Sequence, residues 1–220
     1  MPVDKTMADN ETDHCRLCLV TPAGATAEIF APILDDALDG GDVASLIVTA
    51  PPADLAGLAR VLIPIAQDHG TAVLIHNDAA LAEQFNADGA HIDDLQPDLA
   101  ATASALRPNR IFGVGGLTSR HDAMAVGELD PDYVFFGRLD GDTDDAVFAK
   151  AFDLAAWWAS LFQIPAIVMG GASLASVEPV RDASIEFVAL GRAIWEHPSG
   201  PRAAVAEANR LLAAEPEKVP

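Results

Sequence analysis

The chain has 220 residues, of which 50% are hydrophobic and 21% are charged, and its mean hydropathy is +0.22. A chain of this size and composition can bury a substantial core, which excludes a disordered chain, a collagen, a coiled coil and a small disulfide scaffold. Its 13 lysines and arginines against 33 aspartates and glutamates leave a formal net charge of −20, so its field repels polyanions and anionic membranes. We therefore expect one globular domain with no nucleic-acid partner and no membrane association.

The two ends of the chain differ in character from the rest. No apolar run is long enough to span a bilayer, and residues 1–13 are polar and acidic, unlike a signal peptide. These features predict a cytoplasmic protein. We expect residues 1–13 and 215–220 to be loose tails, and residues 14–214 to form a single domain.

Cys15 and Cys18 form a C-x-x-C pair, the spacing of many redox and zinc sites. Here the pair borders a segment with the character of a strand, in which a spacing of three sends the two thiols to opposite faces. The chain has no second pair of cysteines to complete a zinc site. We interpret both residues as small buried hydrophobic groups.

Short apolar segments typical of strands alternate with longer amphipathic segments rich in alanine and leucine. The segments that we predict as strands are residues 16–20, 43–48, 72–75, 89–92, 111–114, 133–136, 166–169 and 187–190. The predicted helices are residues 25–38, 54–68, 78–85, 95–106, 120–128, 151–161, 176–181 and 203–213.

Eight β/α units predict a single closed (β/α)8 TIM barrel, although 220 residues are few for this fold. An open, doubly wound sheet is the alternative, because it uses the same units and also binds ligands at the carboxyl ends of its strands. Two observations favour the barrel. The first predicted strand is not followed by G-x-G-x-x-G, and glycine turns follow the seventh and eighth predicted strands, where barrels commonly bind phosphate.

These two glycine turns predict a phosphate-binding site. Gly170, Gly171 and Ser173 follow the seventh predicted strand, and Gly191 and Arg192 follow the eighth. Glycine lets backbone N–H groups approach an anion, while the serine hydroxyl and the guanidinium add donors. We expect these N–H groups to be open to a ligand. The alternative is that each turn is only a tight connection.

Polar residues after the third and fourth predicted strands form a second candidate group. Asn77 and Asp78 follow one strand, and His91, Asp93 and Asp94 lie at the end of the other. Neighbouring strand ends would bring an amide and carboxylates together, a set of oxygen ligands that suits Mg²⁺. We predict Asp78, Asp93 and Asp94 as metal ligands and Asn77, Asp78 and His91 as catalytic residues. The alternatives are that Asp78 and Asp94 cap helices and that His91 lines the core.

The turns after the fifth and sixth predicted strands complete the candidate mouth of the barrel. Gly115 and Gly116 expose bare backbone that could admit a flat ring or a diphosphate, with Arg138 nearby. Residues 140–145 carry four aspartates, a composition typical of a solvated loop. Whether this acidic loop closes over the mouth stays open.

Seven short segments carry a family resemblance through their order and spacing. They are residues 17–22 (LCLVTP), 74–78 (LIHND), 87–92 (ADGAHI), 113–114 (GV), 132–137 (DYVFFG), 164–171 (IPAIVMGG) and 188–194 (VALGRAI). Together they resemble the thiamine-phosphate synthase and TenI superfamily of (β/α)8 barrels, over roughly residues 16–212. The resemblance implies a transferase that joins hydroxymethylpyrimidine diphosphate to thiazole phosphate with Mg²⁺. Asn77 and Asp78 would then face the diphosphate, and the turns at Gly170 and Gly191 would hold the thiazole phosphate.

The chain departs from the family pattern at its positive groups. Residues 41–59, which include the end of the second predicted strand, contain no Gln, Arg or Lys, and Ala79 stands where the resemblance implies an arginine. The first hypothesis is a synthase-like transferase of thiamine biosynthesis. The second is a non-catalytic or repurposed barrel, similar to TenI, that binds a small phosphorylated heterocycle. Another phosphosugar enzyme is a third, and a homodimer stays open.

Overall fold

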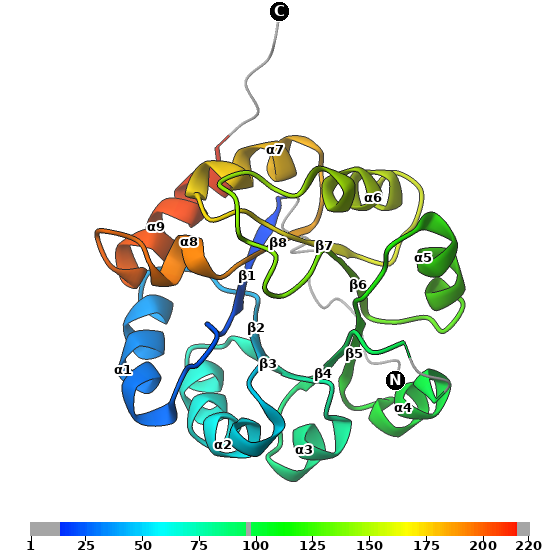
Figure 1. Cartoon of the computed structure of the whole chain (residues 1–220), viewed down its shortest axis with the longest axis horizontal. Coiled ribbons are helices and arrows are strands. Elements are labelled where there is room, and N and C mark those ends of the chain that lie inside the picture. The colour runs from blue at the N-terminus through cyan, green and yellow to red at the C-terminus, as the bar shows by residue number, and fades with distance from the viewer. Residues whose placement is uncertain (1–13, 96–97, 215–220) are drawn as a thin grey trace, which may run out of the picture.

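The computed structural model describes residues 14–95 and 98–214. The two predicted tails, residues 1–13 and 215–220, lie outside the described residues. The described part forms a ring of strands surrounded by helices (Figure 1).

Eight parallel strands close into a barrel in sequence order, which confirms the predicted fold. The strands are β1 (Arg16–Val20), β2 (Ser45–Val48), β3 (Ala72–His76), β4 (Gly89–Ile92), β5 (Ile111–Val114), β6 (Tyr133–Phe136), β7 (Ala166–Met169) and β8 (Phe187–Leu190). The pairing of Leu17 in β1 with Val188 in β8 closes the ring, which excludes an open sheet.

The helices cover the outside of the barrel. They are α1 (Ala27–Leu38), α2 (Pro52–Asp68), α3 (Ala79–Gln84), α4 (Leu99–Leu106), α5 (Arg120–Gly127), α6 (Ala149–Ala159), α7 (Val177–Asp182), α8 (Arg192–Trp195) and α9 (Pro201–Leu212), with a 3₁₀ turn at Leu174–Ser176. One predicted helix start needs correction, and one helix was not among the predictions. The helix expected from residue 95 begins at Leu99, and α8 was not predicted because a four-residue helix is too short to show a period.

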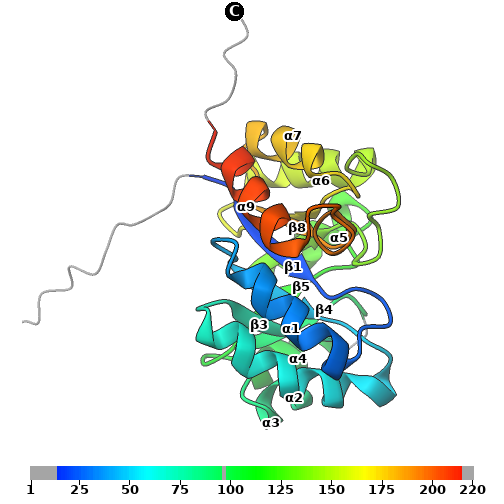
Figure 2. The ribbon, with the colours of Figure 1, turned by 90° about the vertical axis from the view of Figure 1, so that its left-hand side faces the viewer.

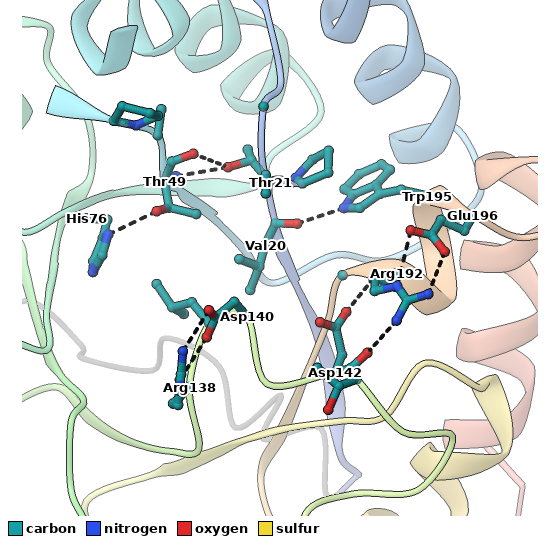
Figure 3. A pocket seen from close by; sticks show the side chains of 18 of the residues that line it. Val20, Thr21, Thr49, His76, Arg138, Asp140, Asp142, Arg192, Trp195 and Glu196 are labelled. Carbon is teal, nitrogen blue, oxygen red and sulfur yellow. Dashed lines mark hydrogen bonds and ion pairs between the residues drawn. The ribbon is translucent and has the colours of Figure 1, made fainter. Parts of the chain in front are cut away.

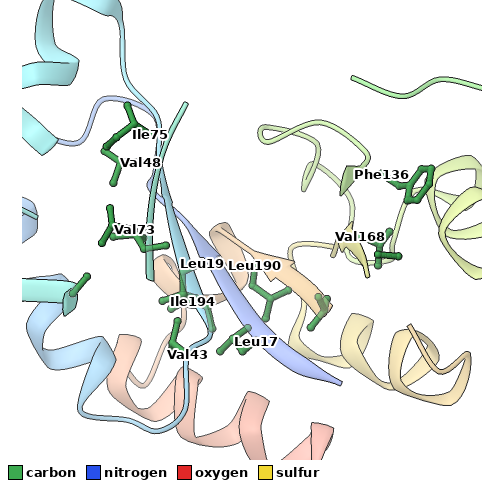
Figure 4. Packing of buried hydrophobic residues seen from close by; sticks show 14 of the residues in the cluster. Leu17, Leu19, Val43, Val48, Val73, Ile75, Phe136, Val168, Leu190 and Ile194 are labelled. Atoms are coloured by element: carbon green, nitrogen blue, oxygen red, sulfur yellow. The ribbon is translucent and has the colours of Figure 1, made fainter. Parts of the chain in front are cut away.

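Alternate side chains of each strand enter two different layers of the core. Leu17 and Leu19 of β1 point outward to the layer between strands and helices, which Figure 4 shows around Leu190 and Ile194. Cys18 and Val20 belong to a second cluster together with residues of β2, β3 and β6 to β8. Because both faces are buried, the strands read as continuous apolar runs.

The two cysteines are free thiols in different layers, as the odd spacing predicts. Cys15 packs in the outer layer and Cys18 in the inner cluster. Burial raises the pKa of Cys15 to about 12 and that of Cys18 to about 11, so both thiols stay protonated at neutral pH. This agrees with a packing role.

One side of the barrel is covered by α1, α2 and α9 (Figure 2). Trp195 of α8 fixes this side to the mouth, because its indole N–H donates to Val20 O at 2.7 Å and its ring packs edge-on against Phe30 of α1. Among the described residues, no helix is both long and apolar enough to cross a membrane.

Candidate functional site

A cavity of about 690 Å³ opens at the carboxyl ends of the strands (Figure 3). One part of its wall is apolar, from Val20, Pro22, Pro51, Leu139 and Trp195. The charged residues among the described lining are Asp93, Arg138, Asp140, Asp142, Arg192 and Glu196. Carboxylates therefore outnumber guanidinium groups around this cavity.

Both arginines of the cavity are already paired. The guanidinium of Arg138 donates two hydrogen bonds to Asp140, at 2.9 and 2.8 Å, and that of Arg192 donates two to Glu196, at 3.1 and 3.0 Å. Figure 3 shows both pairs at the edge of the cavity. Each pair uses the Nε and Nη2 edge of its guanidinium, one of the two edges with which that group can bind a phosphate.

The ends of β2, β3 and β4 form a chain of polar side chains along another edge. The Thr49 hydroxyl lies 3.0 Å from Nδ1 of His76, and Nε2 of His76 lies 2.9 Å from Oδ1 of Asp93. The hydrogen bond from His76 is the first cause that lowers the pKa of Asp93, to about 2, so this carboxylate is ionised at neutral pH. The arrangement holds the imidazole in one orientation against the cavity.

Asn77 joins two strand ends instead of pointing freely into the mouth. Its side chain donates to Oδ1 of Asp93 at 2.7 Å and accepts from the backbone N–H of Asp93 at 2.9 Å and of Asp94 at 3.4 Å. Its φ of +53° lies in the left-handed region that asparagine tolerates. The structure therefore brings together Asn77, Asp93 and Asp94, as predicted from their places at neighbouring strand ends.

Asp78 caps α3, the alternative that the sequence left open. Its Oδ1 accepts from the backbone N–H of Leu81 at 2.8 Å. A carboxylate there also complements the positive end of the helix dipole.

We expect Asp78→Ala to lower the free energy of unfolding by about 1 kcal/mol, because α3 loses its N-cap hydrogen bond. Asp78→Ser keeps a capping oxygen and should retain most of the stability. Urea denaturation of both variants measures the difference. Equal losses in the two variants would contradict a capping role.

Two of the predicted magnesium ligands already have protein partners in this arrangement. Asp78 is used as a cap, and Asp93 is held by His76 and Asn77. Within the described ranges, no group of three or more His, Cys, Asp or Glu side chains is placed to hold a metal ion. Mg²⁺ stays a prediction, and we assign it no step.

His91 is fully buried below the mouth, inside the barrel. Its Nδ1 lies 2.9 Å from the Tyr133 hydroxyl, while its Nε2 has no hydrogen-bond partner among the described residues. Burial, with a smaller contribution from nearby His76, lowers the pKa of His91 far below its ordinary value, so the ring is neutral. This position agrees with the core-lining alternative for His91.

Gly115 and Gly116 lie apart from the main cavity. The backbone N–H of Gly115 donates to Ile92 O at 2.8 Å, and this glycine packs against the His91 ring. Gly116 lines a second cavity of about 430 Å³, between the loops after β5 and β6. Arg138 lines both cavities, so the predicted ring pocket is divided by the loop after β6.

The turn after β7 is filled by the protein itself, contrary to our expectation of open N–H groups. Gly170 N donates to Ala189 O at 2.8 Å, and Gly171 N donates to the Ser176 hydroxyl at 3.0 Å. Ala172 N donates to Asp144 O of the acidic loop at 2.8 Å. Ser173 uses its hydroxyl oxygen to accept from Ala175 N at 3.3 Å.

The turn after β8 is filled as well. The Asp142 carboxylate accepts from the backbone N–H of Arg192 at 2.5 Å, and Asp142 is only 5% exposed. The prediction that residues 140–145 form a solvated loop is therefore wrong for Asp142. Figure 1 shows the loop between β6 and α6 crossing the ring of strands toward α8.

Sequence reasoning missed Thr49, His76 and Asp142 as residues of the site. Thr49 and His76 stand at or directly beyond strand ends, the position from which barrels supply ligand-binding side chains, so this signal was available. No local pattern marks Asp142 among the aspartates of its loop. Its contact with Arg192 spans 50 residues of sequence.

A closed barrel with a partly apolar cavity and polar side chains at its strand ends belongs to the ligand-binding and enzymatic (β/α)8 barrels. The model of one family, described as thiamine monophosphate synthase, matches residues 17–194. The chain belongs to this family.

Curated relatives match along nearly the whole chain. A thiamine-phosphate synthase from Rhodospirillum centenum is 32% identical, over 90% of this chain and 98% of the relative. A thiamine-phosphate synthase from Hyphomonas neptunium is 31% identical, over 90% of this chain and 93% of the relative. These matches confirm the resemblance stated from the sequence.

Solved structures share the fold at low identity. Thiamine phosphate pyrophosphorylase from Pyrococcus furiosus has a TM-score of 0.73 and 16% identity, covering 90% of this chain and 95% of that one. A rubisco-like protein from Burkholderia fungorum has a TM-score of 0.71 and 17% identity, covering 96% of this chain and 63% of that one. At such identities the likeness extends to the fold alone.

Proposed function

We propose that this chain binds one small heterocycle of thiamine biosynthesis in the cavity at the mouth of the barrel, and holds it without coupling it to a pyrimidine diphosphate. Family membership supports the place in thiamine biosynthesis. The observation that carries the proposal is the pairing of Arg138 and Arg192 with carboxylates around this cavity.

The cavity fits a flat ring of modest size. Its volume of about 690 Å³ lies in the range of small-molecule sites, and Pro22, Pro51 and Trp195 supply apolar surface for a ring face. Carboxylates at the opposite edge can accept hydrogen bonds from a hydroxyl or an amino group on the ring. These features suit a nitrogen heterocycle.

The same cavity is poorly suited to the coupling reaction. Departure of pyrophosphate develops negative charge, which positive groups or metal ions must stabilise, and removal of one such donor typically costs about 3 kcal/mol. Residues 41–59 contain no Gln, Arg or Lys, and both guanidinium groups of the cavity are held by their own carboxylates. This balance of charge supports binding without coupling.

A synthase-like transferase is the second candidate. Asn77 and Asp93 at adjoining strand ends favour it, because the family resemblance assigns Asn77 to the diphosphate. In that reaction a diphosphate would compete with Asp140 and Glu196 for the two guanidinium groups.

Titration calorimetry with the hydroxyethyl-methylthiazole alcohol and with its phosphate ester tests the binding. A product assay then adds the pyrimidine diphosphate, thiazole phosphate and Mg²⁺ and measures released pyrophosphate. We expect one ligand to bind and no pyrophosphate to form. Turnover would establish the transferase instead, and failure of both ligands to bind would overturn the proposal.

A pair of variants locates the binding. Ala50 lines the cavity, so Ala50→Phe fills part of it and should abolish the heat of binding. Ala100 is exposed on α4, away from the cavity, and Ala100→Phe should bind like the wild type. Equal binding by the two variants would place the ligand elsewhere.

A further inference from the structure

Asp142 is a buried carboxylate with a specific partner. It is 5% exposed, and its Oδ2 accepts from the backbone N–H of Arg192 at 2.5 Å. This is a short hydrogen bond from a backbone donor to a charged acceptor. The same N–H group belongs to the turn in which the sequence predicts the phosphate of a ligand.

The turn is shaped to receive this carboxylate. A Cβ atom at Gly191 would lie 2.8 Å from Oδ2 of Asp142, so a larger residue at Gly191 would crowd the contact. The neighbouring turn is closed by the same loop, because Ala172 N donates to Asp144 O at 2.8 Å. Two segments of the acidic loop thus occupy donors of both glycine turns.

Among the described residues that line the cavity, the one positive group beside this turn is Arg192. The Arg192 guanidinium is paired with Glu196, and its Nη1 donates to the backbone oxygen of Asp142 at 3.4 Å, so it forms no direct ion pair with the Asp142 carboxylate. A ligand phosphate would have to displace Asp142 or lie beside it. Like charges in contact cost several kcal/mol.

We propose that Asp142 takes the place of the ligand's phosphate, so that the cavity selects a heterocycle without phosphate, either neutral or cationic. This inference rests on the proposed function and names the substrate class of the same site. It replaces the expectation of a phosphorylated ligand held by Gly170, Gly171, Ser173, Gly191 and Arg192. Asp142 acts as a specificity-determining residue and takes no part in a chemical step.

The experiment compares two variants with the same change of charge in the same loop. Asp142→Asn removes the charge next to Arg192 N, whereas Asp144 is exposed and contacts the β7 turn through its backbone oxygen, so Asp144→Asn serves as the matched control. Calorimetry measures the dissociation constants of the thiazole alcohol and of its phosphate ester for each protein. Thermal unfolding checks that the variants are folded.

We expect the wild type to bind the alcohol at least about tenfold more tightly than the ester, since a like-charge contact of about 1.4 kcal/mol already gives that ratio. Asp142→Asn should shift the ratio toward the ester by at least about tenfold, and Asp144→Asn should leave it within about twofold. Equal shifts in both variants, or a wild type that binds the ester at least as tightly as the alcohol, would overturn the proposal.

A second measurement does not depend on the heterocycle. The ³¹P NMR resonance of inorganic phosphate should broaden when Asp142→Asn or Asp142→Ser protein is added. It should stay sharp with the wild type and with Asp144→Asn. If neither Asp142 variant gains phosphate binding, the role of Asp142 is refuted even where the alcohol binds. If phosphate binding appears while no heterocycle binds any variant, the proposed function fails and the role of Asp142 stands.

Discussion

Trp158→Ala is expected to lower the free energy of unfolding by about 4 kcal/mol, as full truncation of a buried tryptophan usually costs 3 to 5. Trp158 is fully buried, its ring stacks on Phe162 with centroids 4.0 Å apart, and its indole N–H donates to Ile164 O at 2.8 Å. The ring also contacts Phe136 of β6, so it fixes α6 to the barrel. Alanine would leave a cavity and an unpaired carbonyl oxygen.

Urea denaturation followed by circular dichroism measures this loss without relying on the tryptophan signal. Trp157→Ala is the control, because Trp157 is adjacent in α6 but only partly buried, with its ring against the Arg120 guanidinium at 4.8 Å. The Trp157 ring also meets Trp158 and Phe162 edge-on, with centroids 6.1 and 5.5 Å apart. We expect the control to lose less than Trp158→Ala, since Trp157 is only partly buried and its cation–π contact contributes about 1 kcal/mol or less. Similar losses of unfolding free energy in the two variants would contradict the larger contribution that we assign to the buried Trp158 ring.

Acidification is expected to destabilise the protein through His91. In the unfolded chain His91 has an ordinary pKa of 6.5, whereas burial, followed by the nearby His76, lowers it to about 3 in the folded chain. Below pH 6.5 the unfolded state therefore binds a proton that the folded state excludes, so stability falls as the pH falls from 6.5 toward 3. Between pH 7.5 and pH 5.0 the loss from this residue is about 2 kcal/mol.

His91→Phe should remove this part of the pH dependence, because phenylalanine keeps a planar ring but cannot take up a proton. Urea denaturation at the two pH values gives the difference for each protein. His69→Gln is the control, since His69 is partly exposed and lies beside Asp35 at the surface. A variant His91→Phe that loses as much stability on acidification as the wild type would contradict the burial of a neutral imidazole.

A network of polar side chains beside the cavity includes Asp93, which the sequence predicts as a ligand of Mg²⁺. Thr49, His76 and Asp93 are joined by hydrogen bonds across three consecutive strand ends. These positions lie where the sequence predicts a free carboxylate at Asp93 for a metal ion. The hydrogen bonds hold Asp93 in place as an ionised partner of His76, and Mg²⁺ binding by this carboxylate stays a prediction.

Most of the fold follows from local patterns that can be read along the chain. Residues 17–20 form an unbroken apolar run because both faces of this strand are buried, and the predicted bounds 16–20 agree with β1. Helix starts were less certain, as the shift from residue 95 to Leu99 shows. Period and composition mark the interior of an element, whereas its ends depend on capping contacts that a sequence shows poorly.

The candidate site likewise contains contacts that the sequence predicts and contacts that it does not predict. Asn77 and Asp93 were predicted to meet because parallel strand ends share one edge of the barrel, and they do meet. The glycine turns were expected to be open, because nothing in their own sequence shows what packs on them. The loop that fills them starts after β6 and reaches a turn 50 residues further on.

The repeated pattern of apolar and turn residues was enough to predict eight β/α units and the strand ends at which polar residues gather, while the closed barrel was favoured by the glycine turns and the family by seven short segments. Only the tertiary structure decided which anion occupies the turn after β8. The position of Asp142 depends on the conformation of a long irregular loop. Its hydrogen bond with the backbone N–H of Arg192 joins residues 50 positions apart, so no local sequence pattern predicts it.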